Sequence, residues 1–246
     1  MRVCIIIPMY NEEVGAHECL SVIVPYLRAL PGENTVLVVE DGSKDATRKI
    51  VEDFISTWGS GQVTLVAHER NQGYGAALRT GIRYAIDRGY DYAVFMDSDL
   101  TNHPRDLPQF YEKMGQGYDY IKATRYSKGG KVEGVPWQRR IVSWAGNTLA
   151  GPAFRIPISD FTNGFRAVKV SVLAKMALTE RSFPIIVEEL WQAKKYARTF
   201  CEVPYVLTSR AEARGRTSFS YGWPTYKAYL KYVWKAFWTK RLSKRI

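Results

Sequence analysis

Two carboxylates one residue apart, Asp97 and Asp99, follow a short apolar run that begins at residue 92. A run of this length is typical of a buried strand and is too short for a stable helix. Side chains two residues apart in an extended segment project to the same side, so both carboxylates can converge on one point. A hard divalent cation, held together with a phosphate group, would relieve their mutual repulsion. A strand that ends in a polar turn has the same residue types, so the pair alone does not decide.

Polar residues follow two earlier apolar runs in the same way. Tyr10-Asn11-Glu12 comes shortly after residues 3–7, and Glu40-Asp41 comes directly after residues 35–39. The carboxyl ends of parallel strands meet at one edge of an open α/β sheet, and such sheets bind ligands at that edge. Three acidic strand ends therefore indicate a site for a nucleotide together with a metal ion.

The elements that must position these residues alternate along the chain. Strands are predicted at residues 3–7, 35–39, 63–67, 92–96 and 203–207, and helices at residues 14–30, 45–57, 75–88, 105–115, 138–150 and 169–177. Strands that alternate with helices of these lengths form βαβ units. The pattern predicts an α/β fold with a mostly parallel sheet and helices on both faces.

Gly73-Tyr74-Gly75 precedes the helix predicted from residue 75. Glycine permits close backbone approach, which makes Gly75 a candidate contact to a ligand. The segment lacks the third glycine of a dinucleotide fingerprint and follows the third strand, and the chain has no Gly-Lys-Ser/Thr phosphate loop. A Rossmann dehydrogenase is therefore disfavoured.

Composition limits the class of protein. The chain has 246 residues, 46% of them apolar, which is enough for a substantial core. Its three cysteines have no metal-ligand spacing, and this favours a reducing compartment. The first residues lack the pattern of a signal peptide, and no segment reaches the ~18 uncharged apolar residues of a membrane span.

Positive charge is concentrated near the C-terminus. Residues 226–246 contribute seven positive and no negative charges to the net charge of +11, which leaves +4 for the first 225 residues. Over residues 226–238, aromatic residues alternate with Lys227, Lys231 and Lys235, a mixture that suits the headgroup layer of a membrane. The alternative is a helix packed on the domain with a solvated lysine face.

The motifs together resemble glycosyltransferase family 2. The resemblance rests on Pro8-Met9-Tyr10-Asn11-Glu12, Glu40-Asp41-Gly42-Ser43-Lys44-Asp45 and Met96-Asp97-Ser98-Asp99-Leu100. Later stretches resemble the polyprenol-phosphate sugar synthases within it, of which dolichol-phosphate mannose synthase is the best known: Thr124-Arg125-Tyr126, Gly129-Gly130, Asn163-Gly164-Phe165-Arg166, and Val203-Pro204 with Arg210, Gly215 and Ser218. The resemblance spans residues 3–220 and implies the GT-A fold, a Rossmann-like sheet.

The resemblance also implies the reaction and the roles of residues. A hexose from GDP-mannose or UDP-glucose would pass to a polyprenyl or dolichyl phosphate with inversion. Asp97 and Asp99 would hold Mg²⁺ or Mn²⁺ as metal ligands, with Asp99 also counted as catalytic. The donor site would comprise Pro8, Tyr10, Glu12, Glu40, Asp41, Gly75, Asp97 and Ser98. The acceptor phosphate would be gripped by Arg125 and Arg210, with Arg139, Arg140 and Arg216 as lesser candidates.

Some positions depart from the pattern of the family. Glu40 stands where an aspartate is usual, and Thr101 stands where a glutamine often supplies a further metal ligand. We expect no counterpart of the two C-terminal membrane helices that many bacterial members carry.

Two other functions stay open at this point. A family member that transfers to a sugar hydroxyl would use Glu188 or Glu189 as general base, although an exposed helical pair is the simpler interpretation. A nucleotide-sugar or nucleic-acid binding module is the non-enzyme alternative, but acidic strand ends would repel nucleic acid.

We therefore expect a glycosyltransferase domain at residues 1–220 and a basic amphipathic tail at residues 221–246. The expected partners are a nucleotide sugar, a polyprenyl phosphate and a membrane surface, without nucleic acid. The expected location is the cytoplasmic face of a membrane, with peripheral association. A separate membrane subunit is compatible with the sequence.

Overall fold

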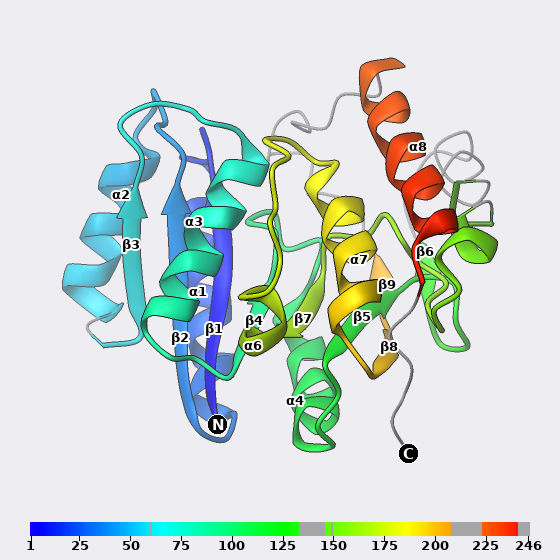
Figure 1. Ribbon diagram of the computed structural model, residues 1–246. Helices are drawn as coiled ribbons and strands as arrows, with labels where there is room; N and C mark the ends of the chain where they lie inside the picture. Colours follow the sequence, from blue (N-terminus) through cyan, green and yellow to red (C-terminus); the bar gives the residue numbers. More distant parts are fainter. Residues whose placement is uncertain (60, 133–145, 149, 208–222, 241–246) are drawn as a thin grey trace.

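The apolar runs of the sequence form a seven-stranded sheet at the centre of the molecule (Figure 1). The computed structural model describes residues 1–59, 61–132, 146–148, 150–207 and 223–240. The strands of the large sheet are β1 (Arg2–Met9), β2 (Glu33–Glu40), β3 (Val63–Ala67), β4 (Tyr92–Phe95), β5 (Tyr120–Thr124), β7 (Arg166–Lys169) and β8 (Phe200–Pro204). A separate small sheet pairs β6 (Lys131–Val132) with β9 (Val206–Leu207).

The large sheet has the order β3-β2-β1-β4-β7-β5-β8. β1 pairs in parallel with both β2 and β4, and β5 pairs in parallel with β8. Only β7 in this sheet runs antiparallel to its neighbours, between β4 and β5. The mostly parallel sheet is thus confirmed, and the carboxyl ends of β2, β1 and β4 lie side by side at its upper edge in Figure 1.

β7 corrects one prediction. The helix predicted over residues 169–177 is wrong for its first residue, because Lys169 belongs to this strand, and the α-helix that follows, α6, spans only Val170–Leu173. Hydrogen bonding from β4 on one side and β5 on the other places the segment from Arg166 in the sheet. This long-range pairing outweighs the weak local preference of the sequence.

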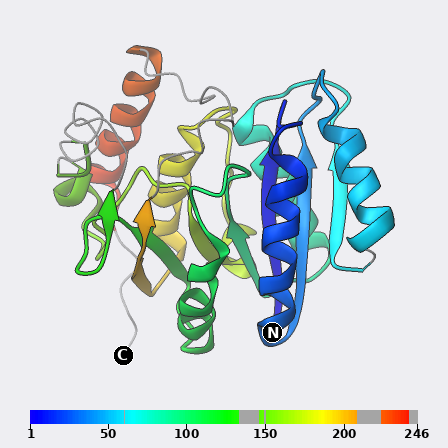
Figure 2. The ribbon, with the colours of Figure 1, turned by 180° about the vertical axis from the view of Figure 1, so that it is seen from behind.

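Helices cover both faces of the sheet. One face is covered by α1 (Ala16–Ala29), α2 (Thr47–Phe54) and α4 (Leu107–Gly115). This face is turned toward the viewer in Figure 2. α3 (Tyr74–Asp87), α6, α7 (Ile185–Tyr196) and α8 (Trp223–Trp238) lie on the other (Figure 1). Alternating residues of β1 serve the two cores: Cys4 and Ile6 pack with α3, while Ile5 and Ile7 pack with α1.

The other predicted helices can now be compared with the structure. Those at residues 14–30, 75–88 and 105–115 are confirmed to within a few residues as α1, α3 and α4, the last preceded by a 3₁₀ turn at Pro104–Asp106. The one at residues 45–57 is α2 followed by a π-helical turn, Ile55–Gly59. Most of the helix predicted at residues 138–150 lies outside the described residues.

The part of the basic C-terminal segment that the structure describes contains α8, which docks on α7 by one face. Tyr232 and Ala236 are buried against α7. The buried Lys194 ammonium donates to the Ala236 and Ala153 carbonyl oxygens, at 2.5 and 3.0 Å. The packed helix is thus confirmed for this face, whereas the opposite face exposes Leu230, Trp234, Phe237 and Trp238. Within the described part of the chain, no helix combines the length and apolarity that crossing a bilayer requires.

Candidate functional site

Asp97 and Asp99 lie just beyond the end of β4, as the sequence predicts. Asp97 Oδ1 accepts a hydrogen bond from the Tyr74 hydroxyl at 3.3 Å, and Asp97 Oδ2 accepts one from the Asn102 amide at 3.1 Å. Asp99 Oδ1 accepts from the backbone amide and the hydroxyl of Thr101, at 3.0 and 2.7 Å. Burial and the neighbouring Asp97 carboxylate raise the pKa of Tyr74 well above its usual value. The two carboxylates are therefore oriented by neighbouring donors.

The donor set fits a hard divalent cation that is bound incompletely by the protein. Carboxylate oxygens are the ligands Mg²⁺ prefers, and it usually keeps several waters alongside substrate phosphates. Among the described residues there is no cluster of three or more His, Cys, Asp or Glu side chains suited to a metal. The Thr101 hydroxyl donates its hydrogen bond to Asp99. An ion held by Asp97 and Asp99 would therefore take its other ligands from phosphate and water.

The ends of β1 and β2 are tied together beside this pair. Asn11, with a positive φ of 54°, donates its amide to the Ser43 hydroxyl at 3.0 Å, and its side chain accepts from the Lys44 amide at 2.9 Å. The Glu12 amide donates to the Thr47 hydroxyl at 2.7 Å. Of the predicted donor-site residues, Pro8, Tyr10 and Glu12 are half-buried at this edge, and Ser98 is buried between the two aspartates. Their contacts to a nucleotide stay a prediction.

The two acids after β2 hold loops in place. Glu40 Oε1 accepts from the Ser43 amide at 2.5 Å. The buried Asp41 carboxylate accepts from the amides of Gln72 and Gly73, at 2.9 and 2.8 Å, and lies 2.7 Å from His68 Nδ1. The sequence predicts that Asp41 frames a base or ribose; in the structure its oxygens bind the loop that leads into α3. His68, a buried partner of Asp41, was missed because it is distant in sequence.

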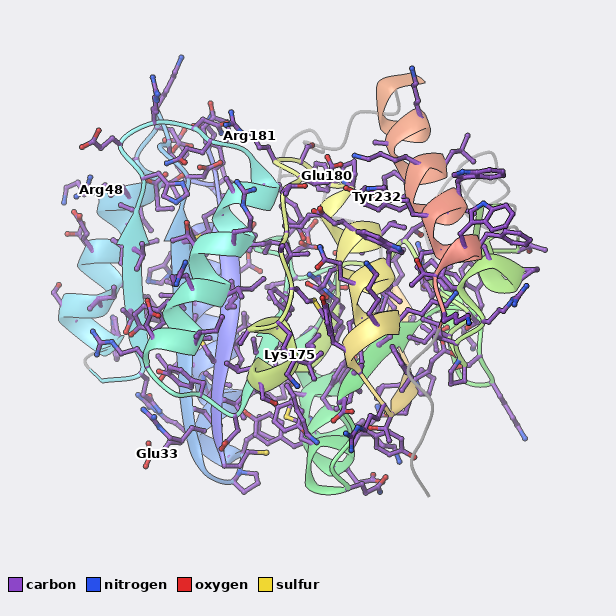
Figure 3. The ribbon with its side chains drawn as sticks, viewed as in Figure 1. Glu33, Arg48, Lys175, Glu180, Arg181 and Tyr232 are labelled. Carbon is purple, nitrogen blue, oxygen red and sulfur yellow. The ribbon has the colours of Figure 1, made fainter. Side chains whose placement is uncertain are left out.

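The close approach predicted at Gly75 occurs, but its partner is the protein backbone. The Gly75 amide donates to the Arg181 carbonyl at 2.9 Å. A Cβ at this position would lie 2.4 Å from the Glu180 carbonyl oxygen. Residues 180–181 fill the space over this glycine, and a contact from Gly75 to the donor stays a prediction. Figure 3 shows Glu180 beside Tyr232 of α8, whose hydroxyl donates to Glu180 Oε1 at 2.7 Å.

Arg125 is held by a bidentate ion pair. Its Nε and Nη2 donate to the two oxygens of Asp160, at 2.7 and 2.8 Å, and Nη2 also donates to the Thr162 hydroxyl at 3.1 Å. The Arg125 side chain is 13% exposed and that of Asp160 is fully buried. The sequence did not identify Asp160 as its partner. Arg210, like Arg139, Arg140 and Arg216, lies outside the described residues, so its role stays a prediction.

Asp160 starts a short segment that links Arg125 to the carboxylate pair. At the other end of that segment, a Cβ on Gly164 would lie 3.3 Å from Asp97 Oδ2. The buried Lys122 ammonium, from β5, donates to the Asn163 carbonyl within this segment. Burial and the nearby Arg166 guanidinium lower the pKa of Lys122 to about 7. The segment from Asp160 to Gly164 thus pairs with the Arg125 guanidinium at one end and lies against the Asp97 carboxylate at the other.

Glu188 and Glu189 are both buried, so the expectation of an exposed pair is wrong. Glu189 accepts from Arg166 Nε and Nη2, both at 2.6 Å, and from the Tyr120 hydroxyl at 2.9 Å. Glu188 accepts from the amides of Thr179 and Glu180. These carboxylates are committed to internal donors, and the alternative of a general base at either position loses its support.

The family described as glycosyl transferase family 2 matches residues 4–177. The chain is 30% identical over 212 residues to a polyprenol monophosphomannose synthase from Mycolicibacterium smegmatis, which covers 85% of this chain and 78% of that protein. It is 30% identical over 223 residues to an undecaprenyl-phosphate mannosyltransferase from Micrococcus luteus, with 89% and 88% covered. Identity to a dolichol-phosphate mannosyltransferase from Pyrococcus furiosus is 32% over 228 residues, with 90% and 62% covered.

A solved structure supports the fold. Glucosyl-3-phosphoglycerate synthase from Mycobacterium tuberculosis, crystallised with Mn²⁺, UDP-glucose and phosphoglyceric acid, superposes with a TM-score of 0.68. The match covers 96% of this chain and 79% of that one at 19% identity, so the similarity shows the fold alone. The predicted GT-A architecture is confirmed.

Replacement of Glu189 tests its internal role. The substitution Glu189→Gln leaves the buried Arg166 without its counter-ion, and loss of one partner of a buried pair costs about 3–5 kcal/mol. We expect the free energy of unfolding in urea to fall by that amount. Glu112→Gln, on an exposed position of α4, is the matched control and should change stability by less than about 0.5 kcal/mol. A variant Glu189→Gln as stable as the parent chain would contradict this role.

Proposed function

The chain belongs to glycosyl transferase family 2, and we propose that within this family it transfers a hexose from a nucleoside diphosphate to a polyprenyl phosphate. The proposed acceptor is supported by relatives named for polyprenol, undecaprenyl and dolichol phosphates. Those names also specify mannose, which makes GDP-mannose the first donor to test and UDP-glucose the second.

One observation carries the proposal: Arg125 and Asp97 lie against opposite ends of the segment from Asp160 to Gly164. A transfer between two phosphate-bearing substrates needs positive charge at two neighbouring places. A cation between Asp97 and Asp99 would serve the donor diphosphate, and the Arg125 guanidinium would serve the acceptor phosphate. Asp160 fixes the plane of that guanidinium, so its positive charge would be held at a defined place for the acceptor phosphate.

The proposed reaction needs no general base. The acceptor phosphate is ionised near neutral pH, so one of its oxygens attacks the anomeric carbon directly. The bond from that carbon to the donor diphosphate breaks, and the nucleoside diphosphate leaves with the electron pair. Attack opposite the leaving group inverts the configuration of the sugar. Bound Mg²⁺ or Mn²⁺ supplies charge neutralisation for the leaving diphosphate, while the protein positions both phosphates.

The transfer itself is tested with labelled nucleotide sugars, Mn²⁺ and a short polyprenyl phosphate. We expect a product that extracts into organic solvent and forms only when the lipid phosphate is present. Asp97→Asn should lower this rate by roughly 100-fold or more, because it removes charge that holds the metal and donor. Asp53→Asn, at an exposed position of α2, is the matched control. A water-soluble glycoside would instead indicate a hydroxyl acceptor, and binding without turnover would indicate a binding module.

Arg125 is tested through the acceptor. Arg125→Lys keeps a positive charge near Asp160 but loses the planar guanidinium that Asp160 and Thr162 hold in place. We expect the KM for the polyprenyl phosphate to rise by about tenfold, while the KM for the nucleotide sugar stays near that of the parent. Arg48→Lys, in an exposed pair with Glu52, is the control. Equal acceptor KM values in the parent and Arg125→Lys would remove Arg125 from the acceptor site.

We also propose that α8 binds a membrane surface peripherally, where the lipid acceptor is embedded. Its outer face exposes Trp234 (66%), Trp238 (68%) and Leu230 (54%), and exposed lysines, among them Lys227, flank these residues. Aromatic side chains favour the headgroup layer, and each basic residue near an anionic surface contributes about 1 kcal/mol. The cytoplasmic face supplies such anionic lipids, and a separate membrane subunit is compatible with this arrangement.

Sedimentation with vesicles tests this surface. We expect the chain to sediment with phosphatidylglycerol vesicles at low salt, and the double change Trp234→Ser with Trp238→Ser to lower the bound fraction severalfold. Trp58→Ser is the matched control, because Trp58 is equally exposed (67%) but follows α2. Failure of the parent to sediment, or equal loss in the control, would refute the assignment to α8.

A further inference from the structure

Tyr74 stands at the first turn of α3 and reaches across to the end of β4. Its hydroxyl donates to Asp97 Oδ1 at 3.3 Å, while the Asn102 amide donates to the other oxygen at 3.1 Å. Gly164 closes the same space, since a Cβ there would lie 3.4 Å from the Tyr74 hydroxyl and 3.3 Å from Asp97 Oδ2. The carboxylate of Asp97 thus accepts hydrogen bonds from Tyr74 and Asn102, and Gly164 leaves little room for a side chain beside it.

The ring of Tyr74 is itself held rigidly. It stacks on Phe183, with ring centroids 4.6 Å apart and planes at 18°. The residues on either side are glycines that pack closely: Cβ atoms on Gly73 and Gly75 would lie 2.4 Å from the carbonyl oxygens of Arg181 and Glu180. Glu180 and Arg181 belong to the loop between α6 and α7, which passes beside the start of α3 (Figure 3). The hydroxyl of Tyr74 is therefore placed by packing.

The acid after β2 fixes the backbone that leads to Tyr74. Both oxygens of Asp41 accept from the amides of Gln72 and Gly73, immediately before α3. His68, which bonds Asp41, also lies 2.9 Å from the Thr80 hydroxyl further along α3. The position of Tyr74 is consequently set by Asp41, at the end of β2. Its hydroxyl bonds to Asp97, just beyond the end of β4.

We propose that Tyr74 is a positioning residue, whose hydroxyl orients the Asp97 carboxylate for a divalent cation bound together with the donor diphosphate. This inference rests on the metal-dependent reaction proposed above. Hydrogen bonds to a metal-binding carboxylate restrict its rotation, and their removal typically costs 10–100-fold in metal affinity. Asp41 takes part indirectly, through the loop that carries Tyr74.

The experiment compares Mn²⁺ binding by the parent chain and by Tyr74→Phe, which removes one oxygen and keeps the stacked ring. Free Mn²⁺ is followed by electron paramagnetic resonance in the presence of GDP, and separately of UDP. We expect about tenfold weaker Mn²⁺ binding in Tyr74→Phe, with nucleotide affinity measured in EDTA unchanged. Tyr84→Phe, on the same helix and packed against Tyr90, is the matched control and should bind Mn²⁺ as the parent does.

The possible results separate this inference from the function on which it rests. Equal Mn²⁺ affinity in Tyr74→Phe and the parent would overturn the positioning role alone. A matching loss of metal-free nucleotide affinity would show that the hydroxyl only supports the fold, and would also overturn it. A parent chain that binds no Mn²⁺ with either nucleotide would overturn the inference together with the metal-dependent reaction. Finally, Tyr74→Phe could bind Mn²⁺ about tenfold more weakly than the parent although the parent transfers no sugar to a lipid phosphate. That result would support the inference and refute only the proposed acceptor.

Discussion

The buried ion pair between Arg166 and Glu189 connects the sheet to the helical layer above it. Both side chains are completely buried, and a buried charge is tolerated only when a partner and hydrogen bonds compensate for lost hydration. Arg166 begins β7, and its guanidinium lies over the ring of Phe95 with 4.0 Å between them. Phe95 ends β4, two residues before Asp97. The pair therefore fixes α7, the antiparallel strand and the end of β4 relative to one another.

Several other acids of the site also act within the protein. Asp160 holds Arg125, Asp41 holds the loop before α3, and Glu188 holds the backbone at residues 179–180. Such carboxylates preorganise the groups that would meet the substrates, so the protein need not rearrange as charge develops on the leaving diphosphate. In this arrangement Asp97 and Asp99 are the carboxylates proposed to meet the metal ion.

α8 connects the proposed membrane surface with the same scaffold. Its inner face is anchored by Lys194 and by the bond from Tyr232 to Glu180, and the backbone of Glu180 packs over Gly75. Its outer face presents tryptophans and leucine to solvent. A surface that binds lipid headgroups would thus lie on a helix fixed relative to the catalytic edge, which suits an acceptor whose phosphate stays near the bilayer.

The sequence was enough to predict the architecture and the edge of the sheet at which the polar residues gather. Apolar runs of strand length alternating with helical segments lead to a mostly parallel sheet, and polar residues that follow those runs must gather at its carboxyl edge. These conclusions depend on local periodicity, which a single sequence contains. The tertiary structure alone decided the partners of the charged side chains. Arg125 and Asp160 are 35 positions apart, and Arg166 and Glu189 are 23 apart, so no local pattern pairs them. For the same reason Glu188 and Glu189 looked exposed and Tyr74 went unnoticed, because burial and hydrogen bonding are set by segments that meet only when the chain folds.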